Sequence, residues 1–403
     1  MLSIKSKNII SARLKRRRLF DIALHTSSFI SILILGSFLL LIGANLVHGI
    51  YNSLYFSELL IKVDEKNLEN DLNNKNYIKI INDGLKIIHN NHCHKVDSNL
   101  LFNYSAVVNL RNNPNQIMQN KNLWIPTGVK VDSYFKKQST LLNDKNIINC
   151  IDNLKKNNLI RNNFNLNPLK NPDSRIANIA GITSSLCGSL ITILIAMIPS
   201  VIIGVLTGIF LEKFMPKGKI ATFVSILINN LASTPSIIYA VFGLSVYINI
   251  FNLPRSAPIT GGLTLATMAL PIIIIHTRQA LNYIPKAITN AALSLGASKI
   301  QTVFHHVVPC AIPYIANGVI LAMARILGES APLLLIGMSA FISDIPHSIY
   351  SPATVIPLQI YIWNNNPDYY FHNLASIAIA ALFIIILLLN MVANHIKKIF
   401  KTK

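Results

Sequence analysis

Two oppositely charged residues, Arg325 and Glu329, lie inside a long apolar stretch in the C-terminal part of the sequence. A charged side chain at the centre of a membrane costs roughly 2.5–3.5 kcal/mol on insertion scales, so it usually faces the interior of a helix bundle. A guanidinium binds phosphate oxygens through paired hydrogen bonds. Arg325 could therefore meet an anion on a path through the membrane. Glu329 could accept a hydrogen bond from a protonated phosphate, or release Arg325 when the anion leaves.

The alternative interpretation is that Arg325 and Glu329 form an i,i+4 ion pair within one helix. Arg before Glu is the less favourable order for such a pair, and desolvation would leave much of its cost uncompensated. We expect Glu329 to be the only acidic residue inside a membrane span. A third charged residue, Arg278, lies near the cytoplasmic end of another apolar stretch. It either extends to the membrane surface or contacts the substrate.

The composition of the 403-residue chain is that of a polytopic membrane protein. Hydrophobic residues make up 52% and charged residues 13%, and the mean hydropathy is +0.46. Charged residues usually amount to about 25% of a soluble domain. Apolar runs of more than about 20 residues recur, and that is the length that spans a bilayer core of about 30 Å. A soluble enzyme, a disordered chain and an outer-membrane barrel are excluded.

Six transmembrane helices are predicted, and the fold class is an all-α polytopic membrane protein. The net charge of +20 belongs largely to basic residues that flank the apolar segments. This pattern is typical of cytoplasmic loops rather than of a nucleic-acid-binding surface, and it predicts that both termini are cytoplasmic. The predicted spans cover residues 22–47, 183–211, 220–250, 260–281, 312–337 and 372–396.

Four regions follow from these spans. Residues 1–50 contain the basic N-terminus and the first helix, residues 51–175 an external insert, residues 176–396 the main membrane domain, and residues 397–403 a cytoplasmic tail. The insert holds most of the acidic residues and short amphipathic segments, so we expect an α-rich, water-exposed domain. Its two cysteines, Cys93 and Cys150, form a disulfide or remain free thiols.

The segment 284–309, between the fourth and fifth spans, predicts a cytoplasmic helix, a turn and a second helix. Gly296 can supply the positive φ that such a turn often needs, and Ser298 can cap the following helix. Apolar Ala291, Ala292 and Leu295 on an otherwise polar loop suggest a surface for a partner protein. The alternative is an ordinary re-entrant hairpin.

This segment resembles the EAA coupling motif of ABC-importer permeases, written E-A-A-x3-G-x9-I-x-L-P. Asn290 stands where the motif has Glu, and His306 stands where it has Ile. In that family the helix docks in a groove of the ATPase, so the resemblance implies that residues 284–309 form the coupling loop. The expected coupling residues are Asn290, Ala291, Ala292, Leu295, Gly296, Ala297 and Pro309.

The sequence around Arg325 narrows the resemblance. Residues 324–334 read A-R-I-L-G-E-S-A-P-L-L, which is similar to the R-x-x-G-E-[TS]-A-P-L-L signature of PstA-type permease subunits of phosphate ABC importers. Residues 269–281 resemble the segment before the coupling loop in that family, although Arg278 stands where Glu is more common. The resemblance covers about residues 176–396 and implies a type I ABC-importer (MetI-like) permease fold.

The same resemblance implies a multi-pass subunit of the bacterial inner membrane that works by alternating access, with Arg325, Glu329 and Arg278 along the substrate path. The implied partners are a second permease subunit (PstC type), two copies of a cytoplasmic ATPase (PstB type), a periplasmic phosphate-binding protein (PstS type) and membrane lipid. No nucleic acid, cofactor or metal is implied.

Enzyme motifs are absent from the sequence, which contains no Walker P-loop, HExxH or G-x-S-x-G. ATP would therefore be hydrolysed by a partner. The alternative functions are a permease for another oxyanion (phosphonate, sulfate or molybdate), a membrane-embedded lipid-phosphate transferase, and a signalling scaffold.

Overall fold

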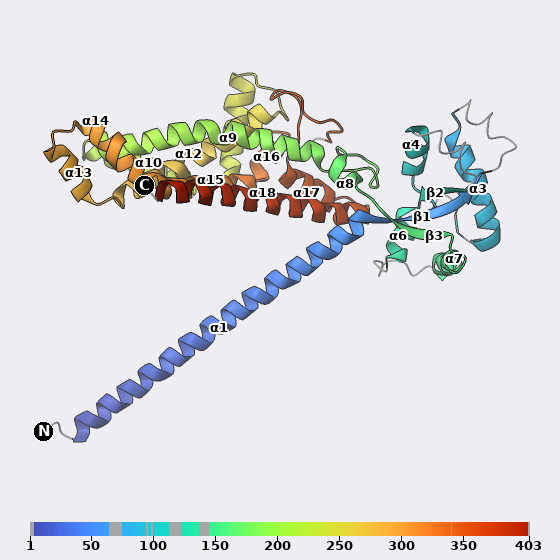
Figure 1. The fold of residues 1–403 in the computed structure, drawn as a ribbon, viewed down its shortest axis with the longest axis horizontal. Coiled ribbons are helices and arrows are strands. Elements are labelled where there is room, and N and C mark those ends of the chain that lie inside the picture. The colour runs from blue at the N-terminus through green and yellow to red at the C-terminus, as the bar shows by residue number, and fades with distance from the viewer. Residues whose placement is uncertain are drawn as a thin grey trace.

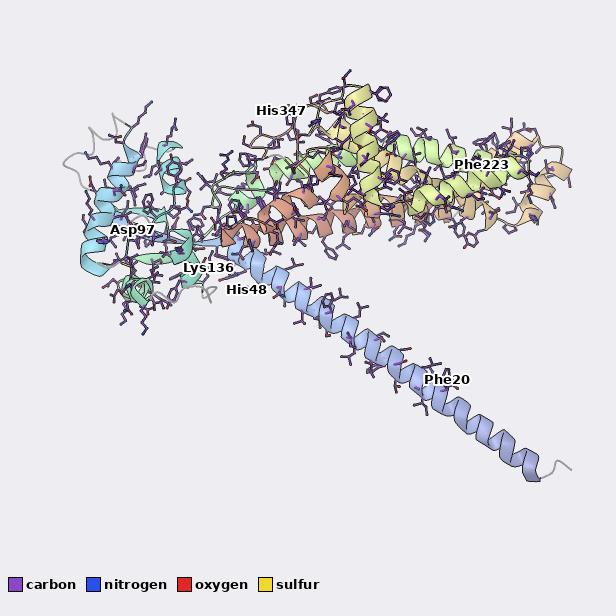
Figure 2. All side chains as sticks on the ribbon, turned by 180° about the vertical axis from the view of Figure 1, so that it is seen from behind. Phe20, His48, Asp97, Lys136, Phe223 and His347 are labelled. Carbon is purple, nitrogen blue, oxygen red and sulfur yellow. A yellow bond between two sulfur atoms is a disulfide. The ribbon has the colours of Figure 1, made fainter. Side chains whose placement is uncertain are left out.

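The computed structural model describes residues 4–63, 75–93, 96–97, 100–112, 122–136, 145–339 and 341–401. Most of this part is helical, and the helices form an elongated bundle with a small domain at one end (Figure 1). The C-terminal end of the first helix, α1 (Ile4–Leu54), lies against the bundle, and the rest of this helix stands away from the bundle (Figure 1). Phe20 lies on the separate part of α1 (Figure 2). Residues 402–403 of the predicted tail and several stretches of the predicted insert lie outside the described residues.

Membrane-spanning helices follow the predicted order along the chain. Within the described residues, five helices are long and apolar enough to cross a membrane, and a pair bent by 102° adds a sixth span if its two arms count as one. The polytopic helical fold class is thereby confirmed. After α1, the spans are α9 (Thr183–Ile209, continued by a π-helical turn to Phe214), the bent pair α10 (Lys219–Ser233) and α11 (Ser236–Phe242, continued by a π-helical segment to Ile250), α12 (Pro258–Asn282), α15 (Val308–Leu327) and α18 (Tyr369–Lys401). The shorter helices of this domain are α13 (Lys286–Ser294), α14 (Lys299–Gln301), α16 (Ala331–Leu335) and α17 (Ile356–Asn364).

The fifth span differs from its predicted bounds of 312–337. Helix α14 runs through a π-helical segment into α15, so one apolar rod begins at Lys299 and ends at Leu327. The chain then leaves the helix, and Pro332 lies in the first turn of the separate helix α16. Pro suits a first turn because its missing N–H is one that the helix would leave unpaired. Glu329 lies between the two helices, so the prediction that it sits inside a span is wrong.

Close contact between α9 and α12 forms the centre of the bundle. A methyl group added at Gly204 would lie 2.8 Å from Cγ2 of Ile273, and one added at Gly208 would lie 2.7 Å from Cβ of Thr277. These separations are shorter than van der Waals contact, so only glycine fits at either position. Small residues four apart allow helix backbones to approach closely within a membrane. This packing fixes the helices that flank the charged residues considered below.

The insert contains a three-stranded antiparallel sheet in the order β2-β1-β3. Its central strand, β1 (Tyr55–Lys62), follows α1 directly and pairs with β2 (Asn122–Pro126) and β3 (Ile160–Phe164). The insert is rich in helix as predicted, but the sheet was not anticipated. The helices around the sheet are α3 (Tyr77–His92), α4 (Ser105–Asn112), α6 (Val129–Phe135), α7 (Lys145–Lys156) and α8 (Asn167–Lys170).

A disulfide joins Cys93, at the end of α3, to Cys150 in α7. Both cysteines are buried in the core of the insert, together with Ile81, Leu85 and Leu154. The bond decides between the two alternatives that the sequence left open. It ties the helices to one another across a stretch of 57 residues.

A buried polar network joins the insert to the end of α1. The carboxylate of Asp132 accepts hydrogen bonds from the backbone and hydroxyl of Ser57 and lies 2.6 Å from Nζ of Lys136. Lys136 also donates to the backbone carbonyl of Asn52 in α1. Figure 2 shows Lys136 at this junction. Because the buried charges are paired and hydrogen-bonded, they hold the insert against the first span.

Candidate functional site

The predicted helix–turn–helix between the fourth and fifth spans is confirmed. Helix α13 ends at Ser294, and Gly296 then adopts a φ of +84°. Ser298 caps α14, because its hydroxyl accepts from the backbone of Gln301 while the Gln301 side chain accepts from the backbone N–H of Ser298. This reciprocal capping box satisfies two backbone donors at once. The turn is therefore encoded locally.

Apolar side chains of this hairpin are strongly exposed. Leu295 is 90% exposed, Ile300 62% and Leu293 46%. Ala291 and Asn290 are also exposed, whereas Ala292 is buried. Ala297 is half-buried, and Pro309 lies eight residues beyond Gln301 in the first turn of α15. The exposed leucines of the hairpin provide a surface that a partner could cover.

The hairpin and the insert lie at opposite ends of the molecule (Figure 1). The hairpin of α13 and α14 occupies one end of the bundle, and the C-terminus lies beside it. The sheet of the insert occupies the other end. This arrangement agrees with a hairpin on one side of a membrane and an insert on the other.

Arg325 and Glu329 do not form the intrahelical pair that the sequence allowed. Helix α15 ends at Leu327, between the two residues. Arg325 is exposed in this single chain, and Glu329 is half-buried in the link to α16. Within the described residues, no ion pair involves Arg325. Its guanidinium is left without a counter-charge, which makes it available to an anion.

Arg278 has an ion-pair partner, Glu212, that its sequence did not predict. Its Nε lies 3.2 Å from Oε2 of Glu212, and its Nη1 donates to the hydroxyl of Ser225 at 2.9 Å. Glu212 belongs to the π-helical turn that extends α9, so an acidic residue does lie within the second span. The sequence did contain a signal for this pair, because Glu212 is a single acidic residue directly after the predicted second span, 183–211. Arg278 thereby joins α12 to the end of α9 and to the middle of α10.

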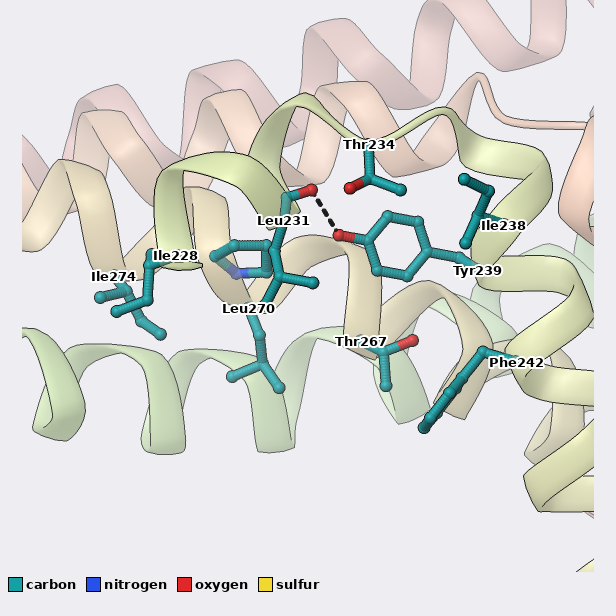
Figure 3. Close-up of a pocket in the computed structure, with 10 residues that line it drawn as sticks. Ile228, Leu231, Thr234, Ile238, Tyr239, Phe242, Thr267, Leu270 and Ile274 are labelled. Atoms are coloured by element: carbon teal, nitrogen blue, oxygen red, sulfur yellow. Dashed lines mark hydrogen bonds between the residues drawn. The ribbon is translucent and has the colours of Figure 1, made fainter. Parts of the chain in front are cut away.

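The break in the third span adjoins a cavity of about 400 Å³ that the sequence did not reveal. Its walls are almost entirely apolar, and the hydroxyls of Thr234, Tyr239 and Thr267 are the polar side-chain groups drawn in the close-up (Figure 3). The Tyr239 hydroxyl donates to the backbone carbonyl of Leu231 at 2.6 Å, across the bend.

The spans, the broken helix and the exposed hairpin define a multi-pass membrane transport subunit. Residues 200–403 match the family described as binding-protein-dependent transport system inner membrane component. The chain belongs to this family, which comprises permease subunits of ABC importers. It is an inner-membrane permease subunit and not an enzyme, and its family works together with an ATPase and a substrate-binding protein.

Individual relatives agree with this family. The chain is 32% identical over 235 residues to the probable ABC transporter permease YqgI of Bacillus subtilis, covering 55% of this chain and 79% of that one. It is 30% identical over 218 residues to the phosphate transport system permease PstA of Yersinia pestis, covering 54% and 72%. Among solved structures, the inward-facing MetNI methionine ABC transporter has a TM-score of 0.43 at 20% identity, over 53% of this chain and 94% of that one.

Proposed function

We propose that this chain is the PstA-type permease subunit of a phosphate ABC importer, and that Arg325 and Glu329 lie on the anion path. The observation that carries the proposal is the exposed guanidinium of Arg325, which has no ion-pair partner in the described part of the chain. An uncompensated cation at membrane depth is costly unless it faces a partner, water or an anion. The relative from Yersinia pestis, named as a phosphate transport permease, supports phosphate over other oxyanions.

The exposure of Arg325 in the isolated subunit has a direct consequence for the proposed assembly. A guanidinium in the last turn of a span is costly when it faces lipid, so we expect another protein surface to enclose the path beside it. We assign this surface to a second permease subunit of PstC type. The complete importer would also contain two PstB-type ATPases and a PstS-type phosphate-binding protein.

Coupling to the ATPase is assigned to residues 284–309. Leu295 is the most exposed large apolar side chain of the hairpin, and an exposed apolar group surrounded by polar residues is typical of a binding surface. Asn290 stands where the EAA coupling motif of ABC-importer permeases has a glutamate. Apolar contacts would therefore contribute more to ATPase docking in this chain than in a permease with that glutamate. Closure of the ATPases on ATP would then move α13 and, through the continuous rod from Lys299, the fifth span.

Arg278 is the weaker candidate on the proposed path. Glu212 already compensates its charge, and Ser225 holds its second nitrogen. An anion would reach this guanidinium only after the pair with Glu212 opens. We therefore place Arg278 near the cytoplasmic exit, beyond Arg325.

The proposed orientation places the hairpin and both termini in the cytoplasm and the insert in the periplasm. Basic residues beside the spans support this orientation, as does the disulfide in the insert, since disulfides persist in oxidising compartments. Cysteines introduced beside Lys217 and Lys286 should be shielded from an impermeant external thiol reagent, whereas one beside Asp344 should react. The two free cysteines, Cys187 and Cys310, must first be replaced by Ser.

The proposed function is tested by phosphate uptake into proteoliposomes that contain the full complex. Arg325→Gln keeps hydrogen-bonding capacity but removes the charge, and a lost charge-assisted hydrogen bond at the barrier slows transport by about 10- to 100-fold. Arg255→Gln, on an exposed outer loop, is the matched control and should transport normally. Wild-type uptake by Arg325→Gln would remove Arg325 from the path.

Competing anions and the ATPase separate the remaining alternatives. Excess sulfate, molybdate or phosphonate should leave uptake of labelled phosphate unchanged if phosphate is the substrate. An ATPase should co-purify with the complex, and uptake should require ATP. Activity on a lipid phosphate without any ATPase would instead support the transferase alternative.

A further inference from the structure

The hairpin of α13 and α14 carries positive charge and no negative charge. The sequence contains no Asp or Glu between Glu212 and Glu329, and this interval includes the whole hairpin. Glu212 is already paired with Arg278, with 3.2 Å between the carboxylate and the guanidinium. The hairpin itself contains two lysines, Lys286 and Lys299, and both are exposed. Their charge is therefore not balanced by any carboxylate of the hairpin.

Neither lysine is explained by the stability of its own helix. Lys286 is the first residue of α13 and Lys299 the first residue of α14, and neither helix has an acidic residue in its first turn. The N-terminus of a helix carries partial positive charge, so a lysine there is unfavourable. Lys299 lies over the ring of Phe214, and no ion pair involves either lysine within the described residues. Both charges remain for a partner.

Asn290 leaves the charge of Lys286 uncompensated. It lies four residues after Lys286 on α13, and both side chains are exposed. Residues four apart on a helix are neighbours, so a glutamate at this position would partly neutralise the lysine, whereas the neutral amide does not. Leu293 and Leu295, which are 46% and 90% exposed, follow in the same hairpin. The hairpin therefore presents lysines and leucines together.

The length of the fifth span argues against lipid headgroups as the balancing charge. Residues Lys299–Leu327 form one rod of 29 residues, which is about 43 Å long at about 1.5 Å per residue. A bilayer core is about 30 Å thick, and headgroups add about 5–7 Å on each side. With Arg325 at membrane depth, as the proposed path requires, the excess length lies at the hairpin. Figure 1 shows α13 and α14 at the tip of the bundle, where a protein can reach them.

We propose that the hairpin docks on a surface of the cytoplasmic ATPase that is lined by carboxylates, which pair with Lys286 and Lys299 while Leu295 makes apolar contact. This inference rests on the proposed function, because it assumes that the hairpin binds an ATPase. It adds the sign of the charge on the partner. Complementary charge at an interface selects the partner and suppresses wrong ones, so an ATPase with a basic docking surface would be rejected.

The test changes the charge at position 290 and measures the dissociation constant of the co-purified ATPase from the immobilised complex. Asn290→Glu should raise this constant about fivefold at low ionic strength, because it places a carboxylate against carboxylates and neutralises Lys286. Asn290→Lys should lower it by a similar factor, and Asn290→Gln is the neutral control and should match the wild type. These differences should disappear in about 1 M salt, which screens charges beyond about 3 Å.

The two lysines provide a second test. Lys286→Gln combined with Lys299→Gln should raise the dissociation constant about tenfold at low ionic strength. Lys219→Gln is the matched control, because Lys219 is an exposed lysine at the start of α10, outside the hairpin, and its loss should leave binding unchanged. All the substituted side chains are exposed, so each variant should fold. Unchanged or tighter binding by Asn290→Glu, or wild-type binding by the double lysine variant, would overturn the inference.

The same measurements separate this inference from the proposed function. If no ATPase co-purifies with the wild-type complex, the proposed function is wrong and the inference falls with it. If the ATPase binds the wild type and is lost in Gly296→Val, but its binding does not respond to the charge at position 290, docking by the hairpin stands and the carboxylate-lined partner surface is wrong.

Discussion

Arg278 and Glu212 join two spans at their ends nearest the hairpin of α13 and α14, with 3.2 Å between Nε of the arginine and Oε2 of the glutamate. Their side chains are 27% and 18% exposed, so solvent screens the pair only partly. Glu212 therefore provides the negative charge that complements Arg278.

We expect Glu212→Gln to destabilise the subunit, because it leaves the guanidinium of Arg278 partly buried without its anion. The cost should be about 1.5–3 kcal/mol, the usual range for a hydrogen bond to a charged group, and thermal unfolding in detergent measures it. The charge-swapped double variant Glu212→Arg with Arg278→Glu should recover much of this stability. Normal stability but lost uptake in the double variant would instead support contact between Arg278 and the anion.

The turn at Gly296 provides a test of coupling. Its φ of +84° is costly for a β-branched residue, so Gly296→Val should distort the hairpin and reduce ATP-driven uptake while membrane insertion persists. Gly218→Val is the control, because Gly218 has extended backbone and open space around its Cβ position. ATPase binding by the purified subunit is the direct measurement. Equal binding by both variants would exclude the hairpin as the docking element.

The contact between α9 and α12 predicts a strong effect of a small change. Gly204→Ala places a methyl group 2.8 Å from Cγ2 of Ile273, which forces the two helices apart. Overpacking of this kind costs about 1–3 kcal/mol, so the melting temperature of the detergent-solubilised subunit should fall. Gly36→Ala, on the separate part of α1 with nothing within 4 Å, should leave it unchanged.

Asp173 predicts a pH dependence of stability outside the membrane. Burial raises the pKa of this carboxyl above its ordinary value of 3.8, although Gln359, Trp363 and Ser174 donate hydrogen bonds that oppose the shift. The folded state therefore binds the proton more tightly than the unfolded state. Its stabilising contribution is complete below pH 3.8 and is lost as the pH rises through the raised pKa.

Two variants at this position should behave differently. Asp173→Asn removes the titration and lets the buried Gln359 Oε1, which has no partner among the described residues, accept a hydrogen bond. The melting temperature of Asp173→Asn at pH 7 should equal or exceed that of the wild type. Its melting temperature should rise less on acidification than that of the wild type. Asp173→Ala leaves the buried donors of Gln359 and Trp363 unpaired and should cost about 1–3 kcal/mol for each. Identical pH profiles for Asp173→Asn and wild type would show that Asp173 does not control this dependence.

Local signals in the sequence predicted local structure well. Gly296 and Ser298 specify their turn through residues within one helical turn of each other, and the structure has both features. The prediction that Glu329 lies inside a span was wrong because the apolar run continues past Leu327. Composition alone does not reveal that the helix ends there. The span prediction could place apolar segments but not the breaks inside them.

Long-range pairing set the limit of prediction from sequence. Strand β1 pairs with partners about 60 and 100 residues away, and neither partner has a strong strand pattern in its Asn-rich surroundings. The contact between Arg278 and Glu212 and that between Tyr239 and Leu231 likewise depend on helix packing. The motifs around Arg325 and residues 284–309 identified the family, whereas the contacts between these segments and the rest of the chain required the structure.

Because Tyr55 pairs with Phe164, the whole insert could be replaced as one unit. The chain enters the insert at Tyr55, directly after α1, and leaves it at Phe164, so entry and exit are neighbouring strands of one sheet. Backbones of paired strands lie about 5 Å apart. A tight two-residue hairpin could bridge that gap, so the whole insert could be replaced by a short turn without moving the first span. A change in the length of the insert can therefore be absorbed between Tyr55 and Phe164, because the sheet holds these two positions side by side.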